Sequence, residues 1–186
     1  MNTITAHQVQ LIRDAHALGH PDRQIAAHSG TSIATVKRWR KTLGLGTRSQ
    51  TDQLARLGEG VVRDAALHQG LSVLWRDCDN APYDMVVGGR RVDVKSAMQR
   101  PDGSWRFRLP RTNSSFYGQY TYAKNLSRDC DVVALVCVFP DKREPEVYLL
   151  ESSSLPTNLT IRPGGPYEAN RGDWALVTPP MLAISA

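Results

Sequence analysis

The sequence has 186 residues, 41% of them hydrophobic, and a formal net charge of +5 at pH 7. This length suits one medium domain, or a small domain joined to a larger one, and the composition suits a globular core. No apolar run approaches the roughly 20 residues that span a bilayer. The segment at the N-terminus is too polar for a signal peptide, so we expect a cytoplasmic protein with no membrane partner.

The cysteines indicate neither a disulfide framework nor a zinc site. Cys78, Cys130 and Cys137 have no even count and no CxxC spacing. We therefore expect reduced thiols, two of them in or beside a buried strand.

The excess positive charge is confined to the first quarter of the chain. Residues 1–50 contain seven Lys or Arg against two Asp, whereas residues 51–186 contain sixteen of each sign. Such segregation favours a polyanion as the partner of the first segment.

Three short helices are predicted in this basic segment. Apolar spacing indicates a first helix over residues 5–18, Pro21 begins a second that reaches Ala27, and Ser32 caps a third that runs to about residue 43. Gly30 makes the turn between the last two helices. The pattern resembles the helix-turn-helix of resolvases and transposases, which implies a DNA-binding domain over residues 1–46. Residues 47–53 are predicted to be a linker.

The third helix divides into an apolar inner face and a polar outer face. Ile33, Val36 and Trp39 are predicted to face inward. The candidate DNA-binding residues on the outer face are Ser32, Thr35, Lys37, Arg38, Arg40 and Lys41. Short polar side chains followed by cations match a helix that reads base edges first and contacts phosphates behind them. The alternative is a three-helix bundle used for protein contacts.

Residues 54–186 are predicted to form an α/β domain with a central mixed sheet flanked by helices. The expected elements are a helix ending at Gly70, a strand over 71–75, a hairpin over 83–95, a strand over 105–109, a helix over 120–126, and strands over 132–138 and 146–150. In the first helix, Glu59 stands between Gly58 and Gly60. Because glycine weakens a helix interior, this triplet predicts a close approach of the helix backbone to a neighbour.

The hairpin is predicted to place two carboxylates side by side. With Gly88 and Gly89 as a tight turn, the paired residue numbers sum to 177, so Asp84 lies opposite Asp93. Alternation then puts Lys95 on the face of the two aspartates and the valines on the other. Opposed carboxylates repel unless a cation lies between them, and Mg²⁺ prefers such oxygen ligands. The alternative is an exposed hairpin with mixed charges and no function.

The order and spacing of Glu59, Asp84 and the Asp93-Val94-Lys95 tripeptide resemble the PD-(D/E)XK nuclease superfamily. The resemblance implies a restriction-endonuclease-like fold in which Asp84 and Asp93 bind Mg²⁺, with Mn²⁺ able to substitute. It further implies that the Val94 carbonyl is a ligand, that Lys95 assists the attacking water, and that Glu59 supports the metal, either directly or through water.

The sequence departs from that pattern at two positions. Tyr83 stands where the name-giving proline is expected, with Pro82 one place earlier, and an aspartate rather than a glutamate precedes the lysine. Both variants occur in such families. Lys124 and Arg128, four residues apart, are candidate phosphate contacts on a predicted helix, with solvated surface as the alternative.

These features together predict a Mg²⁺-dependent, site-specific DNA endonuclease of restriction or homing type. Cutting both strands of a duplex concertedly requires two active sites, so we expect a homodimer or a higher oligomer. A Holliday junction resolvase with the same chemistry is one alternative. A DNA-binding regulator with an inactive nuclease domain is the other.

Overall fold

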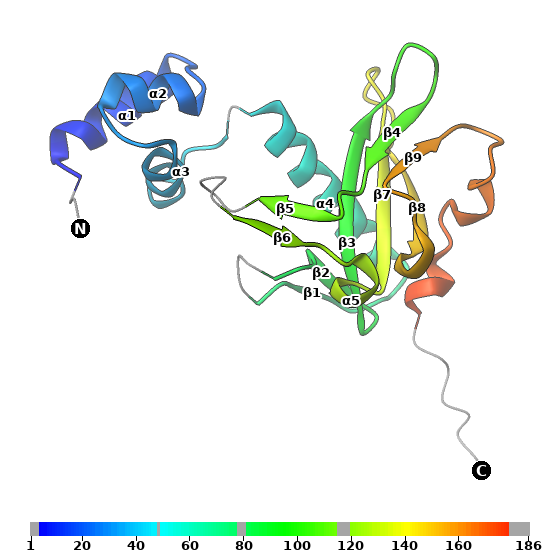
Figure 1. Ribbon diagram of the computed structural model, residues 1–186. Helices are drawn as coiled ribbons and strands as arrows, with labels where there is room; N and C mark the ends of the chain where they lie inside the picture. Colours follow the sequence, from blue (N-terminus) through cyan, green and yellow to red (C-terminus); the bar gives the residue numbers. More distant parts are fainter. Residues whose placement is uncertain (1–3, 48, 78–80, 115–119, 179–186) are drawn as a thin grey trace. The chain divides into compact units, whose positions relative to one another are not determined.

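The computed structural model describes residues 4–47, 49–77, 81–114 and 120–178 (Figure 1). The chain divides into two compact units, Met1–Leu54 and Ala55–Ala186. The predicted linker over 47–53 is partly wrong, because helix α4 (Gln50–His68) begins inside it. The Ser49 hydroxyl accepts a hydrogen bond from the Asp52 amide at 3.2 Å, which caps and extends the helix in the N-terminal direction. Cys78 lies outside the described residues.

The N-terminal unit consists of α1 (Ala6–Ala17), α2 (Asp22–Ser29) and α3 (Ile33–Thr42), as the sequence predicts. Gly30 ends α2 with φ of 63°, and the Ser32 hydroxyl caps α3 by accepting from the Thr35 amide. Its core consists of Ile12, Ala15, Ile25, Ala26 and Val36, with Trp39 packed against it. Ile33, predicted to face inward, is exposed at the first position of α3.

Arg40 does not lie on the outer face of α3, which corrects the sequence prediction. Its side chain is only 6% exposed, and its Nε lies 2.6 Å from Asp22 Oδ1. One terminal nitrogen donates to Asp22 Oδ2 at 2.7 Å and the other to the Gly46 carbonyl at 2.8 Å. The Nε contact has the distance of an ion pair without the angles of a hydrogen bond. Arg40 therefore joins α3 to α2 and to the segment after α3, whereas Lys37, Arg38 and Lys41 are exposed.

We expect Arg40→Ala to destabilise the N-terminal unit by about 3–5 kcal/mol, because it leaves the Asp22 carboxylate buried without its cation. Arg38→Ala, which removes an exposed cation of the same helix, should change stability by no more than about 0.5 kcal/mol. Hydrogen exchange of the α1–α3 amides in the full chain measures both. Equal protection in the two variants would contradict the structural role of Arg40.

The C-terminal unit has a five-stranded mixed sheet in the order β1-β2-β3-β7-β8, which confirms the predicted α/β class. The strands are β1 (Val73–Trp75), β2 (Met85–Val87), β3 (Arg90–Met98), β7 (Val132–Val138) and β8 (Glu146–Glu151). β3 and β7 are parallel, and the other neighbours are antiparallel. Every residue of β7 is buried, as expected for a central strand covered on both faces.

Different elements cover the two faces of this sheet. Gly58 of α4 packs against Ser96 and Val136, so α4 lies on the face of these two side chains. The opposite face carries a core that includes Ala97, Val133, Leu135 and Cys137. A two-stranded ribbon formed by β4 (Trp105–Arg108) and β9 (Asn158–Ile161) contributes to this core (Figure 1). The remaining short helices are η1 (Ser152–Ser154), η2 (Glu168–Asn170) and η3 (Trp174–Val177).

The helix predicted over 120–126 is wrong. Thr121–Ala123 forms strand β6, which pairs with β5 (Thr112–Ser114), and the helix α5 comprises only Leu126–Asp129. β-branched and aromatic residues before Ala123 favour the extended chain. The Asp129 carboxylate accepts from the Asn125 amide at 3.1 Å and closes the single helical turn.

The predicted close approach of α4 is confirmed at Gly58 and not at Gly60. A Cβ at Gly58 would collide with the Ser96 hydroxyl oxygen, whereas a Cβ at Gly60 would meet nothing within 4 Å. Glycine is therefore required only at the first position, where the helix contacts β3.

This difference predicts opposite effects of two neighbouring substitutions. Gly58→Ala should destabilise the C-terminal unit by about 1–3 kcal/mol through overpacking against β3. Gly60→Ala should be neutral or stabilise it by about 0.5–1 kcal/mol, since alanine is the better helix former. Urea unfolding followed by circular dichroism compares them, and a Gly58→Ala protein as stable as Gly60→Ala would disprove the close contact.

The two described cysteines are buried, as predicted. Burial raises the pKa of the Cys130 thiol to about 11, and burial raises that of Cys137 further, so both remain protonated thiols. In the part of the chain that the structure describes, no helix is long and apolar enough to cross a membrane.

Candidate active site at the β2–β3 hairpin

The hairpin has the register that the sequence predicts. Met85 pairs with Val92 and Val87 with Arg90, around Gly88 and Gly89 with φ of 56° and 86°. Both turn residues thus adopt the positive φ that a type I′ turn requires. Asp84 lies just before β2, and its amide donates to the Val92 carbonyl at 3.0 Å. The pairing therefore carries Asp84 alongside the Val92–Val94 segment of β3.

Asp93 is buried rather than solvated. Its side chain is 5% exposed, whereas that of Lys95 is 28% exposed. The alternation of the hairpin places Asp93 on the face opposite α4, where the core that includes the β4–β9 ribbon also lies. The face shared by the two aspartates and Lys95 is thus largely covered, and the buried carboxylate oxygens of Asp93 require partners.

Two lysines supply those partners. Lys95 Nζ lies 2.6 Å from Asp93 Oδ2, and Lys124 Nζ lies 3.4 Å from Asp93 Oδ1. Lys95 also donates to the Val94 carbonyl at 3.1 Å, and its contact with Oδ2 lacks hydrogen-bond angles. The Asp93 carboxylate is therefore neutralised by two ammonium groups, one from its own strand and one from a distant segment.

Asp84 is held against the main chain between the two motif residues. Its Oδ2 accepts from the Val94 amide at 2.8 Å, and its Oδ1 lies 3.2 Å from the Arg76 guanidinium. Because Lys95 and Asp84 bond to the two sides of the same Val94 residue, the structure brings Asp84, Asp93 and Lys95 together as predicted.

Glu59 belongs to the same electrostatic cluster. It is half-buried on α4, and burial raises the pKa of its carboxyl, with a further increase from the negative charge of Asp84. The positive charges of Arg76, Arg56 and Lys95 oppose this rise in pKa. Among the described residues, no hydrogen bond joins Glu59 to Asp84 or Asp93.

The oxygens assigned to the metal fit a small hard cation. Within the described ranges, no group of three or more His, Cys, Asp or Glu side chains is arranged to hold a metal. The ligands that the sequence resemblance implies are two carboxylates and one main-chain carbonyl. Each candidate now contacts a cationic group: Asp84 contacts Arg76, while Asp93 and the Val94 carbonyl contact Lys95. These oxygens are therefore paired with side-chain cations, and carboxylate and carbonyl oxygens are the ligand type that hard divalent cations take.

Lys124 is a site residue whose position the sequence analysis missed. It follows β6, where its amide donates to the Arg111 carbonyl at 2.8 Å, and its side chain is 11% exposed. A helical surface position was predicted instead, because a three-residue strand is too short to show a two-residue period. Arg128, its predicted neighbour, is exposed and pairs with Asp129 rather than with the cluster.

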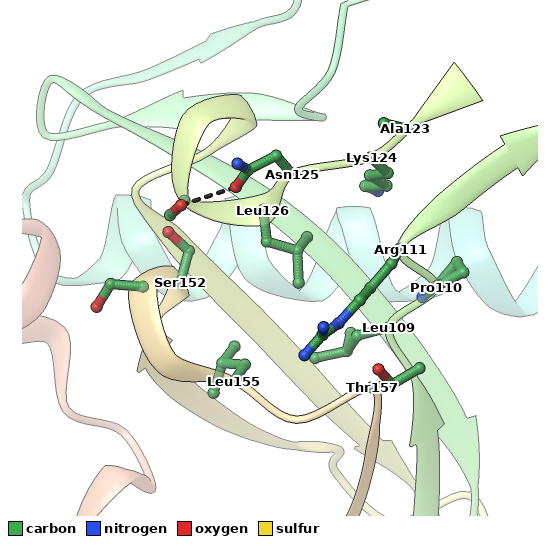
Figure 2. Close-up of a pocket in the computed structure, with 12 residues that line it drawn as sticks. Leu109, Pro110, Arg111, Ala123, Lys124, Asn125, Leu126, Ser152, Leu155 and Thr157 are labelled. Atoms are coloured by element: carbon green, nitrogen blue, oxygen red, sulfur yellow. Dashed lines mark hydrogen bonds between the residues drawn. The ribbon is translucent and has the colours of Figure 1, made fainter.

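A polar cavity lies beside Lys124. It has a volume of about 350 Å³ and is lined by the segments around Arg111, Lys124, Ser127, Ser152 and Thr157 (Figure 2). Figure 2 shows the Arg111 side chain directed across this cavity toward Leu109 and Thr157. The lysine thus separates the buried carboxylate from an open polar space.

Comparison with known proteins supports the fold. No known family and no curated protein matches this sequence. One similar solved structure is described as that of a bacterial homing endonuclease, I-Ssp6803I. The chain shares its α/β fold with that protein. The TM-score is 0.55 at 19% identity, and the match covers 69% of this chain and 93% of the other.

Proposed function

We propose that this protein is a Mg²⁺-dependent endonuclease that cuts double-stranded DNA at specific sites. The observation that carries the proposal is the junction at Val94, where Asp84 bonds the amide and Lys95 bridges the carbonyl to the buried Asp93. The shared fold with a homing endonuclease supports it, as does the order of these residues in the PD-(D/E)XK pattern.

The site residues take distinct roles in this proposal. Asp84, Asp93 and the Val94 carbonyl would hold Mg²⁺, and Glu59 would support it through water. When bound, the ion would stabilise negative charge on the phosphate and lower the pKa of a water molecule bound to it. Lys95 then orients the attacking water or stabilises the charge that develops on the phosphate. Lys124 helps to orient Asp93, because it is a second cation against the same carboxylate.

The N-terminal unit is proposed to be a helix-turn-helix module that finds the target. Lys37, Arg38 and Lys41 are exposed on α3, and cations at such positions of a recognition helix contact phosphates. Near the start of the helix, the hydroxyls of Ser32 and Thr35 lie 3.0 Å apart, and Ser32 caps the helix. Arg40 is removed from the proposed DNA contacts, since its guanidinium is bound to Asp22 and Gly46.

A recognition module favours restriction-type or homing-type cleavage over general degradation. Cutting both strands requires two copies of the site, so the active form is proposed to be a homodimer or higher oligomer. These copies would carry one recognition module each.

Incubation of the protein with a randomised duplex library and Mg²⁺, followed by sequencing of the products, tests the proposal. We expect cuts at a defined sequence, no cuts with a chelator, and cleavage restored by Mn²⁺. The Asp93→Asn protein, purified in parallel, controls for a contaminating nuclease. Folded wild-type protein that leaves every duplex intact with either metal would reject the proposal, and preferential cutting of a four-way junction would indicate a resolvase instead.

A further inference from the structure

The β4–β9 ribbon has one apolar face and one polar face. Trp105, Phe107, Leu159 and Ile161 point into the core and are buried. The other face consists of two cross-strand pairs, Arg106 with Thr160 and Arg108 with Asn158. Residues of both strands line a shallow hollow of about 260 Å³. Packing against the main sheet thus accounts for one face of the ribbon and leaves the polar face without a role in the core.

The charge of this polar face is uncompensated. Arg106 and Arg108 are exposed, and neither has an ion pair or side-chain hydrogen bond within the part of the chain that the structure describes. Most other arginines of the C-terminal unit contact a carboxylate: Arg63, Arg76, Arg90, Arg91, Arg128, Arg143, Arg162 and Arg171. The residues opposite the two ribbon arginines are an amide and a hydroxyl. Two unpaired guanidinium groups beside neutral hydrogen-bonding groups favour an anionic partner with polar edges.

The ribbon is also continuous with the candidate active site. After Arg108, the buried Leu109 donates its amide to the Thr157 carbonyl at 2.6 Å, and the chain reaches Arg111. The Arg111 carbonyl accepts from the Lys124 amide, and Lys124 contacts Asp93. Three extended residues span at most about 10 Å, so only a short stretch of chain separates Arg108 from Arg111, whose carbonyl binds the Lys124 amide. The chain therefore connects the end of the ribbon to the segment that contacts Asp93.

We propose that the polar face of the β4–β9 ribbon reads base edges of duplex DNA beside the cleaved phosphate. A two-stranded β-ribbon fits the major groove, where arginine pairs with guanine, asparagine with adenine and threonine with either. The inference rests on the proposed function and adds to it. Sequence preference would arise partly in the C-terminal unit, through Arg106, Arg108, Asn158 and Thr160, and not only in the N-terminal helices.

Parallel selections from a randomised duplex library, read by binding without added metal, test this proposal. The full-length proteins are wild type, Arg106→Ala/Arg108→Ala and Arg106→Lys/Arg108→Lys, with Lys142→Gln as the control. Lys142 is an exposed cation in the turn after β7, and its side chain makes no ion pair or hydrogen bond with the described residues. The alanine pair should bind the wild-type site at least tenfold more weakly, since one bidentate base contact contributes roughly 5- to 150-fold.

The lysine pair distinguishes base reading from phosphate contact. It keeps both charges and loses the bidentate geometry, so it should retain affinity for random duplexes while the selected sequence loses preference at specific positions. The control should select the wild-type sequence. Unchanged preference in the lysine pair, or an equal loss for all duplexes in the alanine pair, would overturn base reading.

Two further results separate this inference from its alternatives. Light scattering compares the oligomeric state of the alanine pair with that of the wild type. A changed oligomeric state in the alanine pair, together with unchanged DNA preference, would show that the ribbon contacts a second copy of the chain and would overturn the proposal. The selections measure binding and do not depend on cleavage. If the wild type cleaved no DNA, the proposed endonuclease function would be rejected, but the selections would still show whether the ribbon reads bases. If the alanine pair unfolds at lower temperature, the lysine pair decides the outcome.

Discussion

Asp93→Asn should lower the rate of DNA cleavage by at least about 10³-fold, because it removes the charge on which the proposed metal site depends. Asparagine keeps the shape of the side chain and loses the carboxylate that lies between two ammonium groups. Lys95 and Lys124 are then no longer neutralised. We therefore expect DNA affinity measured with a chelator to stay constant or rise, since two free cations attract phosphate.

Single-turnover cleavage with Mg²⁺ and fluorescence anisotropy without metal measure these two effects. Asp141→Asn is the matched control, because Asp141 is an exposed aspartate paired only with Arg143. Normal cleavage by Asp93→Asn protein would remove the hairpin from the mechanism. A parallel loss of cleavage and DNA affinity would instead indicate that Asp93 supports folding of the DNA-binding surface.

Lys95→Ala should lower the cleavage rate by about 10²- to 10³-fold, the usual effect of one positioned electrostatic group. Its ammonium contacts both the Asp93 carboxylate and the Val94 carbonyl, two of the groups that would hold the metal in the proposed mechanism. DNA affinity should change far less than the rate.

Lys124→Ala is the informative comparison for Lys95. Lys124 contacts Asp93 at the longer distance of 3.4 Å and does not contact the Val94 carbonyl among the described interactions. A positioning residue of this kind should contribute about 10- to 100-fold, seen partly as a higher Mg²⁺ concentration for half-maximal rate. Equal rate losses and equal shifts in Mg²⁺ dependence for the two variants would assign both lysines to charge balance rather than catalysis. A normal rate for Lys95→Ala would weaken the PD-(D/E)XK resemblance.

Local interactions explain which features the sequence by itself determined. The hairpin register follows from Gly88 and Gly89 in a tight turn flanked by alternating apolar residues. The three N-terminal helices follow from caps such as Ser32 and from the turn at Gly30. Gly58 indicated that the backbone of α4 closely approaches another element. The sequence did not show which element this is, because a glycine leaves room for a neighbour without specifying it. These signals depend on residues only a few positions apart.

Tertiary packing decided which charged side chains are buried and paired in each of the two units. Helical periodicity placed Arg40 on an outer face, yet Asp22 and the Gly46 carbonyl bury its guanidinium. Alternation placed Asp93 on a polar face, yet that face of the sheet carries the core and Lys124 lies beside the carboxylate from 31 residues away. Periodicity tells which side chains share a face, but the burial and pairing of a charge depend on which distant elements cover that face. The backbone arrangement of the candidate site could therefore be predicted from the sequence. The burial of its charged groups and their ion pairs could be determined only from the tertiary structure.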